Sequence, residues 1–257
     1  MSESLQIKRE GRVMHLVMNR PERRNALNVE LCSAIATAFG QAESDTGVGA
    51  ILLSGNGKSF CSGMDLDEAL TREAGRMNEI HERIFTAGTN LSKPMIAAVH
   101  GAALAGGTGL AANCHIVIAS DDASFGLTEI RIGLWPFVVF RSMAAAIGER
   151  RATEMALSGR IFGADEARQY GLVHQVVDSG SLIPTASQIA ATVAERSPTA
   201  IHTGLAFIRE SRGLAWEQAG LLARRMRESV LSAPDFAEGV RAFREKRSPQ
   251  WPSLSHS

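Results

Sequence analysis

A glycine-rich segment at residues 98–113 has residue types that could hold a negatively charged oxygen. It reads AVHGAALAGGTGLAAN and follows an apolar run that is typical of a buried strand. Gly106 and Gly107 let a backbone approach another group without a Cβ in the way. We expect them at the start of a helix, where unpaired N–H groups and the macrodipole attract negative charge. The segment therefore predicts a site for an oxyanion or a phosphate, and close helix–sheet packing is the alternative explanation of its glycines.

A glutamate in a second segment could act as an acid–base group. Glu129 lies within FGLTEIRIGLWP at 125–136, among aliphatic and aromatic neighbours. Apolar surroundings disfavour a charged carboxylate, raise its pKa and make it a better base near neutral pH. We interpret Glu129 as a candidate base, and the alternative is an ion pair with Arg131 or with another surface charge. Trp135 and Phe137 are expected to shape an apolar pocket or to pack in the core.

The composition argues against several classes of function. Lys plus Arg and Asp plus Glu both number 27, so the formal net charge of the 257-residue chain is zero and a general attraction to nucleic acid is not expected. No run approaches the roughly 18 apolar residues that span a bilayer, and the N-terminus lacks the form of a signal peptide. The three cysteines are too few for a disulfide framework and show no metal-ligand spacing. We expect a cytoplasmic protein without a membrane, metal or redox partner.

The order of elements predicts how these segments are positioned. Two strands around a turn at Glu10 and Gly11 begin the chain, and Asn28 is expected to cap a helix. A long helix is expected at 66–92. Strand-like runs alternate with helical runs and lie at 49–55, 95–99, 116–119 and 172–177. Strands that alternate with helices across short turns predict a mainly parallel sheet in an α/β fold.

The strand signal disappears from about residue 181. Helical runs are expected at 186–195, 199–210, 215–231 and 236–245, with prolines at 184, 198 and 234 as breaks. The apolar residues of this tail, such as Leu221 and Leu222, need a surface to cover, and the protein's own sheet is one candidate.

Six segments in one order resemble the crotonase family of enoyl-CoA hydratases and isomerases. They are NRPERRNAL at 19–27, KSFCSGMDL at 58–66, GAALAGG at 101–107, FGLTEIRIG at 125–133, ADEARQYGLV at 164–173 and FREKRSPQW at 243–251, and the resemblance as a whole covers about residues 5 to 251. The resemblance implies a spiral core of ββα turns at 1–180 that holds an acyl-CoA site. It also implies a C-terminal helical region at 181–257 that makes homotrimers, or hexamers from two trimers.

The same resemblance implies a catalytic set. By motif position the backbone N–H groups of Met64 and Gly106 polarise a thioester carbonyl, and Glu129 is the base. Family members with two catalytic carboxylates place the other at Gly109, where a glycine cannot do acid–base work and is expected to leave empty volume. The residues expected to contact the acyl-CoA substrate are Arg24, Ala26, Ser62, Asp65, Leu66, Gly109, Trp135 and Lys246, the last in its own or a neighbouring subunit. No cofactor is implied besides the coenzyme A of the substrate.

We therefore interpret the chain as an acyl-CoA enzyme that stabilises a thioester enolate with one base, most like a 3,2-enoyl-CoA isomerase. An enoyl-CoA hydratase is the alternative, since another group could position water, and a non-catalytic CoA-binding scaffold is a third. Decarboxylation and thioester hydrolysis would use the same pocket. Asp65 is expected to start a helix. His100 is expected to be hydrogen-bonded in the core, and His81 could approach the acyl end from an amphipathic helix.

Overall fold

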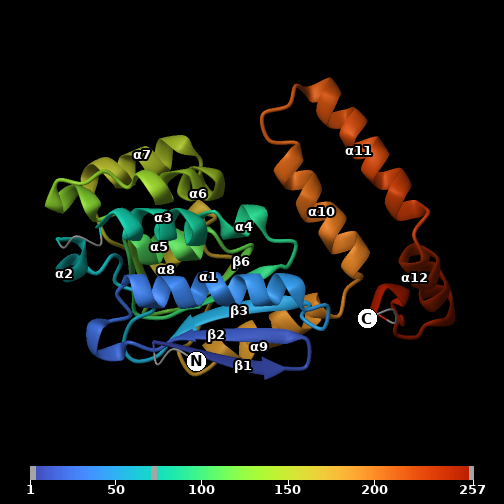
Figure 1. Cartoon of the computed structure of the whole chain (residues 1–257), viewed down its shortest axis with the longest axis horizontal. Coiled ribbons are helices and arrows are strands. Elements are labelled where there is room, and N and C mark those ends of the chain that lie inside the picture. Colours follow the sequence, from blue (N-terminus) through green and yellow to red (C-terminus); the bar gives the residue numbers. More distant parts are fainter. Residues whose placement is uncertain (1–3, 71–73, 255–257) are drawn as a thin grey trace.

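The computed structural model describes residues 4–70 and 74–254, which form two sheets, a set of covering helices and a helical extension (Figure 1). The larger sheet has the strand order β1-β2-β3-β4-β6-β9, in which β1 runs antiparallel to β2 and the other neighbours are parallel. Its strands are β1 (Leu5–Glu10), β2 (Val13–Met18), β3 (Ala50–Gly55), β4 (Met95–Val99), β6 (Ile116–Ser120) and β9 (Gln175–Val177). The smaller sheet consists of β5 (Ala102–Leu104), β7 (Ser124–Gly126) and β8 (Phe162–Gly163).

Successive turns of the chain add a strand to each sheet before a helix begins. β4 leads into β5 and then α5 (Gly106–Ala112), and β6 leads into β7 and the 3-10 helix η2 (Glu129–Ile132). Backbone bridges from Ser59 to Gly101 and from Cys61 to Ala103 attach the preceding turn to the smaller sheet. The predicted spiral of ββα turns is confirmed. It brings the start of α5 and the start of η2 next to the segment at 61–64.

The prediction of one long helix at 66–92 is wrong. The chain instead forms α2 (Leu66–Ala69), α3 (Ala74–Phe85) and α4 (Ala87–Asn90), and residues 71–73 of the predicted helix lie outside the described residues. Asn113 ends α3 from a distance, because its side-chain amide donates to the Ile84 carbonyl at 2.8 Å and its Oδ1 accepts from the Gly88 N–H at 3.2 Å. Upstream, Asn28 caps α1 (Val29–Ser44) as predicted, through its Oδ1 and the Leu31 N–H at 2.9 Å.

Both faces of the larger sheet are covered. One face carries the main apolar core, to which α1, α3, α5 and α6 (Phe137–Ile147) contribute, and α7 (Glu149–Ser158) and α8 (Ala164–Tyr170) complete that side. The other face packs on α9 (Leu182–Ala194), whose small residues Ala186, Ala190 and Ala194 meet Leu52 and Ile96 of the sheet. The proline at 184 does not break this helix, because it lies in the first turn, where an N–H is not needed.

The last three helices lie beside this core rather than over the sheet (Figure 1). They are α10 (Pro198–Glu210), α11 (Trp216–Leu231) and α12 (Pro234–Glu245). Helix α9 already covers the free face of the sheet, and α11 and α12 lie away from the sheet. Large apolar side chains on them are exposed, among them Trp216, Leu221 and Phe243. The protein's own sheet therefore does not cover these side chains. The predicted division of the chain at residue 181, into a core and a helical region, stays a prediction. No helix in the described part of the chain combines the length and apolarity needed to cross a bilayer.

Candidate active site

A cavity of about 450 Å³ lies between α3, the start of α5, η2 and the start of α6. Its wall is mostly aliphatic and aromatic. The polar side chains in the wall are Ser62, Asn78, His81, Thr128 and Glu129, and Met64 and Gly106 line it as well. The fold thus brings Met64, Gly106 and Glu129 into one cavity, from three segments that the sequence separates.

Two backbone N–H groups converge on this cavity. The Leu27 N–H donates to the Gly63 carbonyl at 2.8 Å, and the Asp65 N–H donates to the Leu27 carbonyl at 3.1 Å. Successive residues of an extended segment point to opposite sides, so the Met64 N–H points away from Leu27. A Cβ built on Gly63 would lie 3.4 Å from the Gly106 nitrogen, which shows how closely the two segments approach. This pair can bind a developing oxyanion.

Ala105 holds the second N–H in place through an unusual backbone conformation. Its φ of 50° and ψ of −118° are the angles of the first central residue of a type II′ turn, where glycine is favoured. An alanine in this region costs on the order of 1–3 kcal/mol and persists only where its surroundings fix it. The Ala105 N–H donates to the Gly126 carbonyl at 2.7 Å, which ties the turn to β7. The strain is therefore stored directly before Gly106, and the residue type at 105 gave no sign of it.

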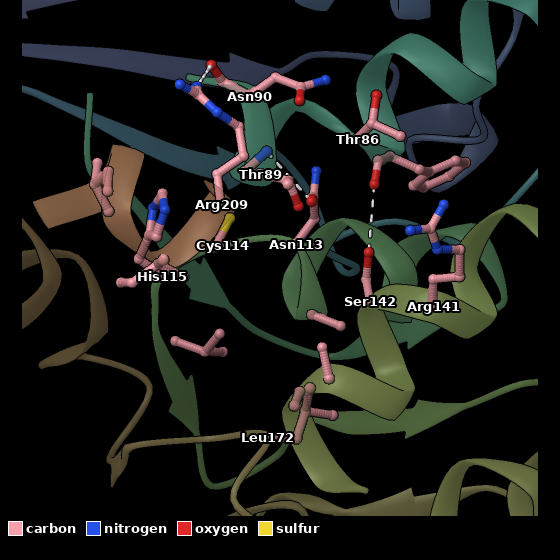
Figure 2. Close-up of a pocket in the computed structure, with 18 of the residues that line it drawn as sticks. Thr86, Thr89, Asn90, Asn113, Cys114, His115, Arg141, Ser142, Leu172 and Arg209 are labelled. Carbon is pink, nitrogen blue, oxygen red and sulfur yellow. Dashed lines mark hydrogen bonds between the residues drawn. The ribbon is translucent and has the colours of Figure 1, made fainter. Parts of the chain in front are cut away.

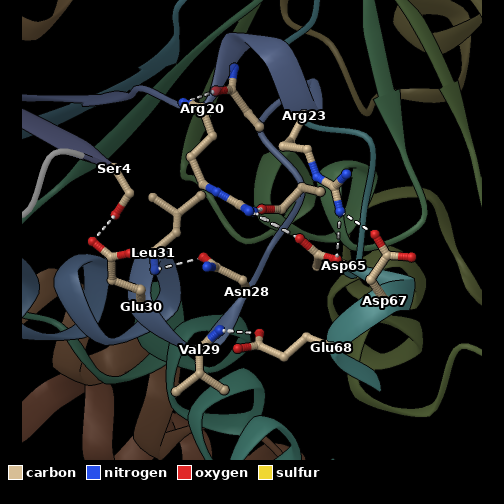
Figure 3. Close-up of polar contacts among 12 residues, drawn as sticks. Ser4, Arg20, Arg23, Asn28, Val29, Glu30, Leu31, Asp65, Asp67 and Glu68 are labelled. Carbon is tan, nitrogen blue, oxygen red and sulfur yellow. Dashed lines mark hydrogen bonds and ion pairs between the residues drawn. The ribbon is translucent and has the colours of Figure 1, made fainter. Parts of the chain in front are cut away.

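The carboxylate of Asp65 is bound by arginine side chains and not by the helix that follows it. Its carboxylate accepts from both Nη atoms of Arg20 at 3.1 Å and lies 3.6 Å from Arg23, as Figure 3 shows. Asp65 is the N-cap residue of α2, so its predicted place at the start of a helix is confirmed, but its side chain makes no capping bond to that helix. Arg23 also pairs with Asp67 at the start of α2. These ion pairs fix the segment after Met64 to the loop at 20–26.

Glu129 is the buried carboxyl group of the cavity. Its side chain is 8% exposed, and its Oε2 has no hydrogen-bond partner among the described residues. Burial raises its pKa to about 7. The alternative of an ion pair with Arg131 is contradicted, since none joins the two within the described residues. A carboxyl group with this pKa can take and return protons near neutral pH.

The position of Gly109 holds no empty volume, which corrects the expectation. A Cβ at this residue would lie 2.2 Å from Val139 Cγ1 and 3.2 Å from Phe85 Cε1. Val139 of α6 thus occupies the place where a side chain at 109 would begin. Gly109 is buried in α5 and does not line the cavity wall itself.

A face of α3 supplies residues to which the sequence gave little weight. Asn78, His81 and Phe85 all line the cavity at helical spacing. His81 is 5% exposed, and burial lowers its pKa to about 4. The spacing of three and four residues was the available signal, but the same spacing describes any helix face.

The remaining predicted substrate contacts fall into two groups. Ser62, Leu66 and Trp135 line the cavity. Arg24 and Ala26 lie in the loop that precedes α1, and the Arg24 carbonyl accepts from the Ser62 N–H at 3.0 Å. Lys246 directly follows α12 and is not among the described residues that line the cavity of its own chain; α12 and α2 lie at opposite sides of the molecule in Figure 1.

A larger cavity of about 610 Å³ lies between α4, α5, α6 and α10 (Figure 2). Its polar groups already have partners: the His115 Nδ1 accepts from the Met95 N–H at 2.9 Å, and Arg212 donates to the Thr89 hydroxyl at 3.0 Å. The described residues that line it include no carboxylate. The smaller cavity has a buried carboxyl group, Glu129, whose Oε2 has no partner among the described residues, and it is therefore the candidate active site.

Comparisons with known proteins agree with this geometry. A model of the enoyl-CoA hydratase/isomerase family matches residues 8–253. A putative enoyl-CoA hydratase of Thermus thermophilus is 35% identical over 247 residues, which cover 94% of this chain and 98% of the relative. The 2,3-dehydroadipyl-CoA hydratase of Escherichia coli is 36% identical over 98% of this chain and 99% of its own length. The crystal structure of an enoyl-CoA hydratase of Mycobacterium smegmatis superposes with a TM-score of 0.91 at 32% identity, over 97% of this chain and 99% of that one.

Proposed function

Because the chain belongs to the enoyl-CoA hydratase/isomerase family, we propose that it acts on an acyl-CoA thioester held at the Met64 and Gly106 N–H groups. The thioester oxygen gains negative charge as an enolate forms. Backbone donors fixed before the reaction stabilise that charge, and each typically changes the rate by about 10²- to 10³-fold. The chemistry needs no metal or redox group beyond the coenzyme A that the substrate carries.

Glu129 is the base of this proposal. In a 3-enoyl-CoA its carboxylate takes a proton from C2, and the electrons move onto the thioester oxygen. The same carboxyl group then gives the proton to C4 as the double bond shifts to C2–C3, so that the enzyme ends unchanged. The observation that carries this assignment is a single buried carboxyl group in the cavity lining, with Val139 in the place of a second one. We therefore place 3,2-enoyl-CoA isomerisation first.

Hydration of a 2-enoyl-CoA is the second candidate. The names of the relatives favour it, since those from Thermus and Escherichia are both called hydratases. Water addition at C3 also uses the enolate and Glu129, but it needs a group that holds the water.

A panel of acyl-CoA thioesters tests both reactions. Saturated, 2-enoyl and 3-enoyl thioesters of several chain lengths are assayed for exchange of the C2 proton in D₂O, for water addition and for double-bond migration. We expect exchange and at least one of the other two reactions. Tight binding of the thioesters with no exchange on any chain would instead support the CoA-binding scaffold and reject an enolate enzyme.

We also propose a homotrimer, or a hexamer of two trimers, held by α10, α11 and α12. The exposed apolar residues of these helices support it. So does the absence of Lys246 from the described lining of its own cavity, because in an assembly Lys246 of the partner subunit could join Arg24 and Ala26 at the coenzyme A. Sedimentation of a monodisperse monomer at micromolar concentration would contradict this assembly.

A further inference from the structure

Two buried side-chain atoms of the active-site cavity have no protein partner. They are the Nε2 of His81 and the Oε2 of Glu129, and among the described residues the only other such atom is the Nε of Arg12. Arg12 contacts α9 through its other nitrogen, far from this cavity in sequence and structure. Leaving a buried polar atom unpaired costs about 1–3 kcal/mol, so such atoms call for an explanation. A polar ligand that binds to both atoms would explain why they have no protein partner.

The His81 ring presents a lone pair to the cavity. Burial lowers the pKa of the ring to about 4, against an opposing backbone hydrogen bond to Leu27, so the ring is neutral near pH 7. In the tautomer that carries its proton on Nδ1, the Nε2 atom, which has no partner among the described residues, is a hydrogen-bond acceptor. The ring also packs edge-on against Phe85, at 5.6 Å between centroids and 66° between planes. A neutral imidazole fixed from two sides is a hydrogen-bond acceptor for something inside the cavity.

The His81 ring and the place of the missing carboxylate both lie against Phe85. Phe85 touches both sites, because its ring contacts His81 and also lies 3.2 Å from the Cβ position of Gly109. Val139 closes the place beside Gly109 completely. A second polar group for the acyl end therefore comes from α3 and not from α5.

We infer that His81 binds the water molecule that adds to C3 of a 2-enoyl-CoA, in the role that a carboxylate at 109 would otherwise have. This inference rests on the proposed enolate chemistry of Glu129 and selects hydration as a reaction of the site. Its ligand is water, and its substrate class is a 2-enoyl thioester.

The proton balance of this reaction closes with one carboxyl group. One O–H of the water donates to His81 Nε2, which turns the oxygen lone pair toward C3. The other proton passes to the Glu129 carboxylate as the C3–O bond forms and the electrons of the double bond move onto the thioester oxygen. Glu129 then delivers that proton to C2 as the enolate collapses. The product carries the OH on C3 and the H on C2, and His81 stays neutral throughout.

The experiment compares two reactions in the same variants. His81→Leu removes the acceptor, and His81→Gln keeps a polar atom at similar reach. Water addition to 2-enoyl-CoA thioesters and exchange of the C2 proton of saturated thioesters in D₂O are measured for each. We expect His81→Leu to lose about 10²-fold in hydration, the typical cost of a misplaced reactant, while exchange changes less than about threefold. His81→Gln is expected to recover part of the hydration rate.

His15 provides a matched control. It is also a buried histidine with a pKa lowered by burial, but its Nε2 is hydrogen-bonded to the Ser54 hydroxyl at 2.7 Å, and it lies outside the cavity. His15→Leu should leave the ratio of hydration to exchange unchanged.

The outcomes separate the two proposals. Equal losses of hydration and exchange in His81→Leu, or hydration within about threefold of the parent, would overturn the role of His81. A parent enzyme that exchanges and isomerises but never adds water would overturn it too and leave the enolate chemistry of Glu129 standing. A parent that catalyses no exchange on any thioester would reject the proposed function itself.

Discussion

The proposed oxyanion site of the cavity is built from the backbone N–H groups of Met64 and Gly106, whereas the proposed proton-transfer and water sites are the side chains of Glu129 and His81. At the first site the side chain of Met64 is nearly free to vary, and the geometry depends on Gly63, Ala105 and the hydrogen bonds of Leu27. For the two side chains the residue type is decisive, because Glu129 has to take and return a proton and residue 81 has to accept a hydrogen bond. A site made of backbone groups is therefore sensitive to substitutions that add atoms. A site made of side chains is sensitive to substitutions that change the functional group.

The largest expected effect comes from Glu129→Gln, which changes chemistry without changing shape. Turnover should fall by about 10²- to 10⁴-fold, as is usual for the loss of a general base. The affinity for a saturated acyl-CoA should change little, because the backbone donors remain. Steady-state kinetics and isothermal titration measure the two. Turnover close to that of the parent would remove Glu129 from the mechanism.

Gly63→Ala tests the backbone side by adding one atom. The new Cβ would lie 2.8 Å from the Ala105 Cβ and 3.4 Å from the Gly106 nitrogen, at a residue whose φ is +97°. We expect the two donors to separate and kcat to fall by up to about 10²- to 10³-fold, the contribution of one donor. Gly213→Ala is the control, since its φ of +80° carries a similar strain with no atom nearby. Equal kinetics in the two variants would show that strain alone matters.

The stability of the side-chain site should depend on pH. Burial raises the pKa of Glu129 to about 7, from an unfolded value near 4.3. The folded state then holds the proton more tightly, so this residue's contribution to stability is present at low pH and is lost as the pH rises to about 7. Glu129→Gln should therefore be more stable than the parent at pH 8, by at most about 4 kcal/mol, and this difference in stability should be smaller at pH 5. Urea unfolding at both values measures it, with exposed Glu79→Gln of α3 as the control. A stability difference that does not change with pH would argue against a buried Glu129 with a raised pKa.

The smallest expected effect concerns Gly109, where a side-chain contact closes off the site. Gly109→Ala places a Cβ 2.2 Å from Val139 Cγ1, and such overpacking costs about 1–3 kcal/mol, partly offset by about 1 kcal/mol of helix propensity. Gly40→Ala in α1 has no atom within 4 Å of the new Cβ and should gain about 1 kcal/mol. In a Val139→Gly background the penalty of Gly109→Ala should largely vanish. Urea unfolding of the four variants in that cycle shows the coupling, and purely additive effects would refute the contact.

Much of the fold could be predicted because local signals agreed with it. Asn28 caps α1, the apolar runs at 95–99 and 116–119 are strands, and prolines begin α10 and α12. The break between α3 and α4 could not be predicted, because the Asn113 side chain holds the backbone there by hydrogen bonds to residues 25 and 29 positions away in sequence. Local periodicity carries no information about such a partner.

The site was predictable where a motif position fixes a backbone group or a single side chain, as for Met64, Gly106 and Glu129, which share one cavity. It was not predictable where the answer depends on packing. The sequence shows a glycine at 109 but does not show whether the space beside it is empty or filled, and in the structure Val139 fills it. Asp65 likewise follows Met64 in sequence, yet it pairs with Arg20 across the loop.

The contact between Gly109 and Val139 also has a consequence for how such sites diversify. Positions 109 and 139 lie on different helices, thirty residues apart. A glutamate that arises first collides with the valine, and a smaller residue that arises first at 139 leaves a hole in the wall. Each single step lowers fitness through folding before any new chemistry can be selected, so the two substitutions are reciprocally epistatic. Libraries that vary one codon at a time would miss the two-carboxylate variant, whereas paired randomisation of both codons would sample it directly.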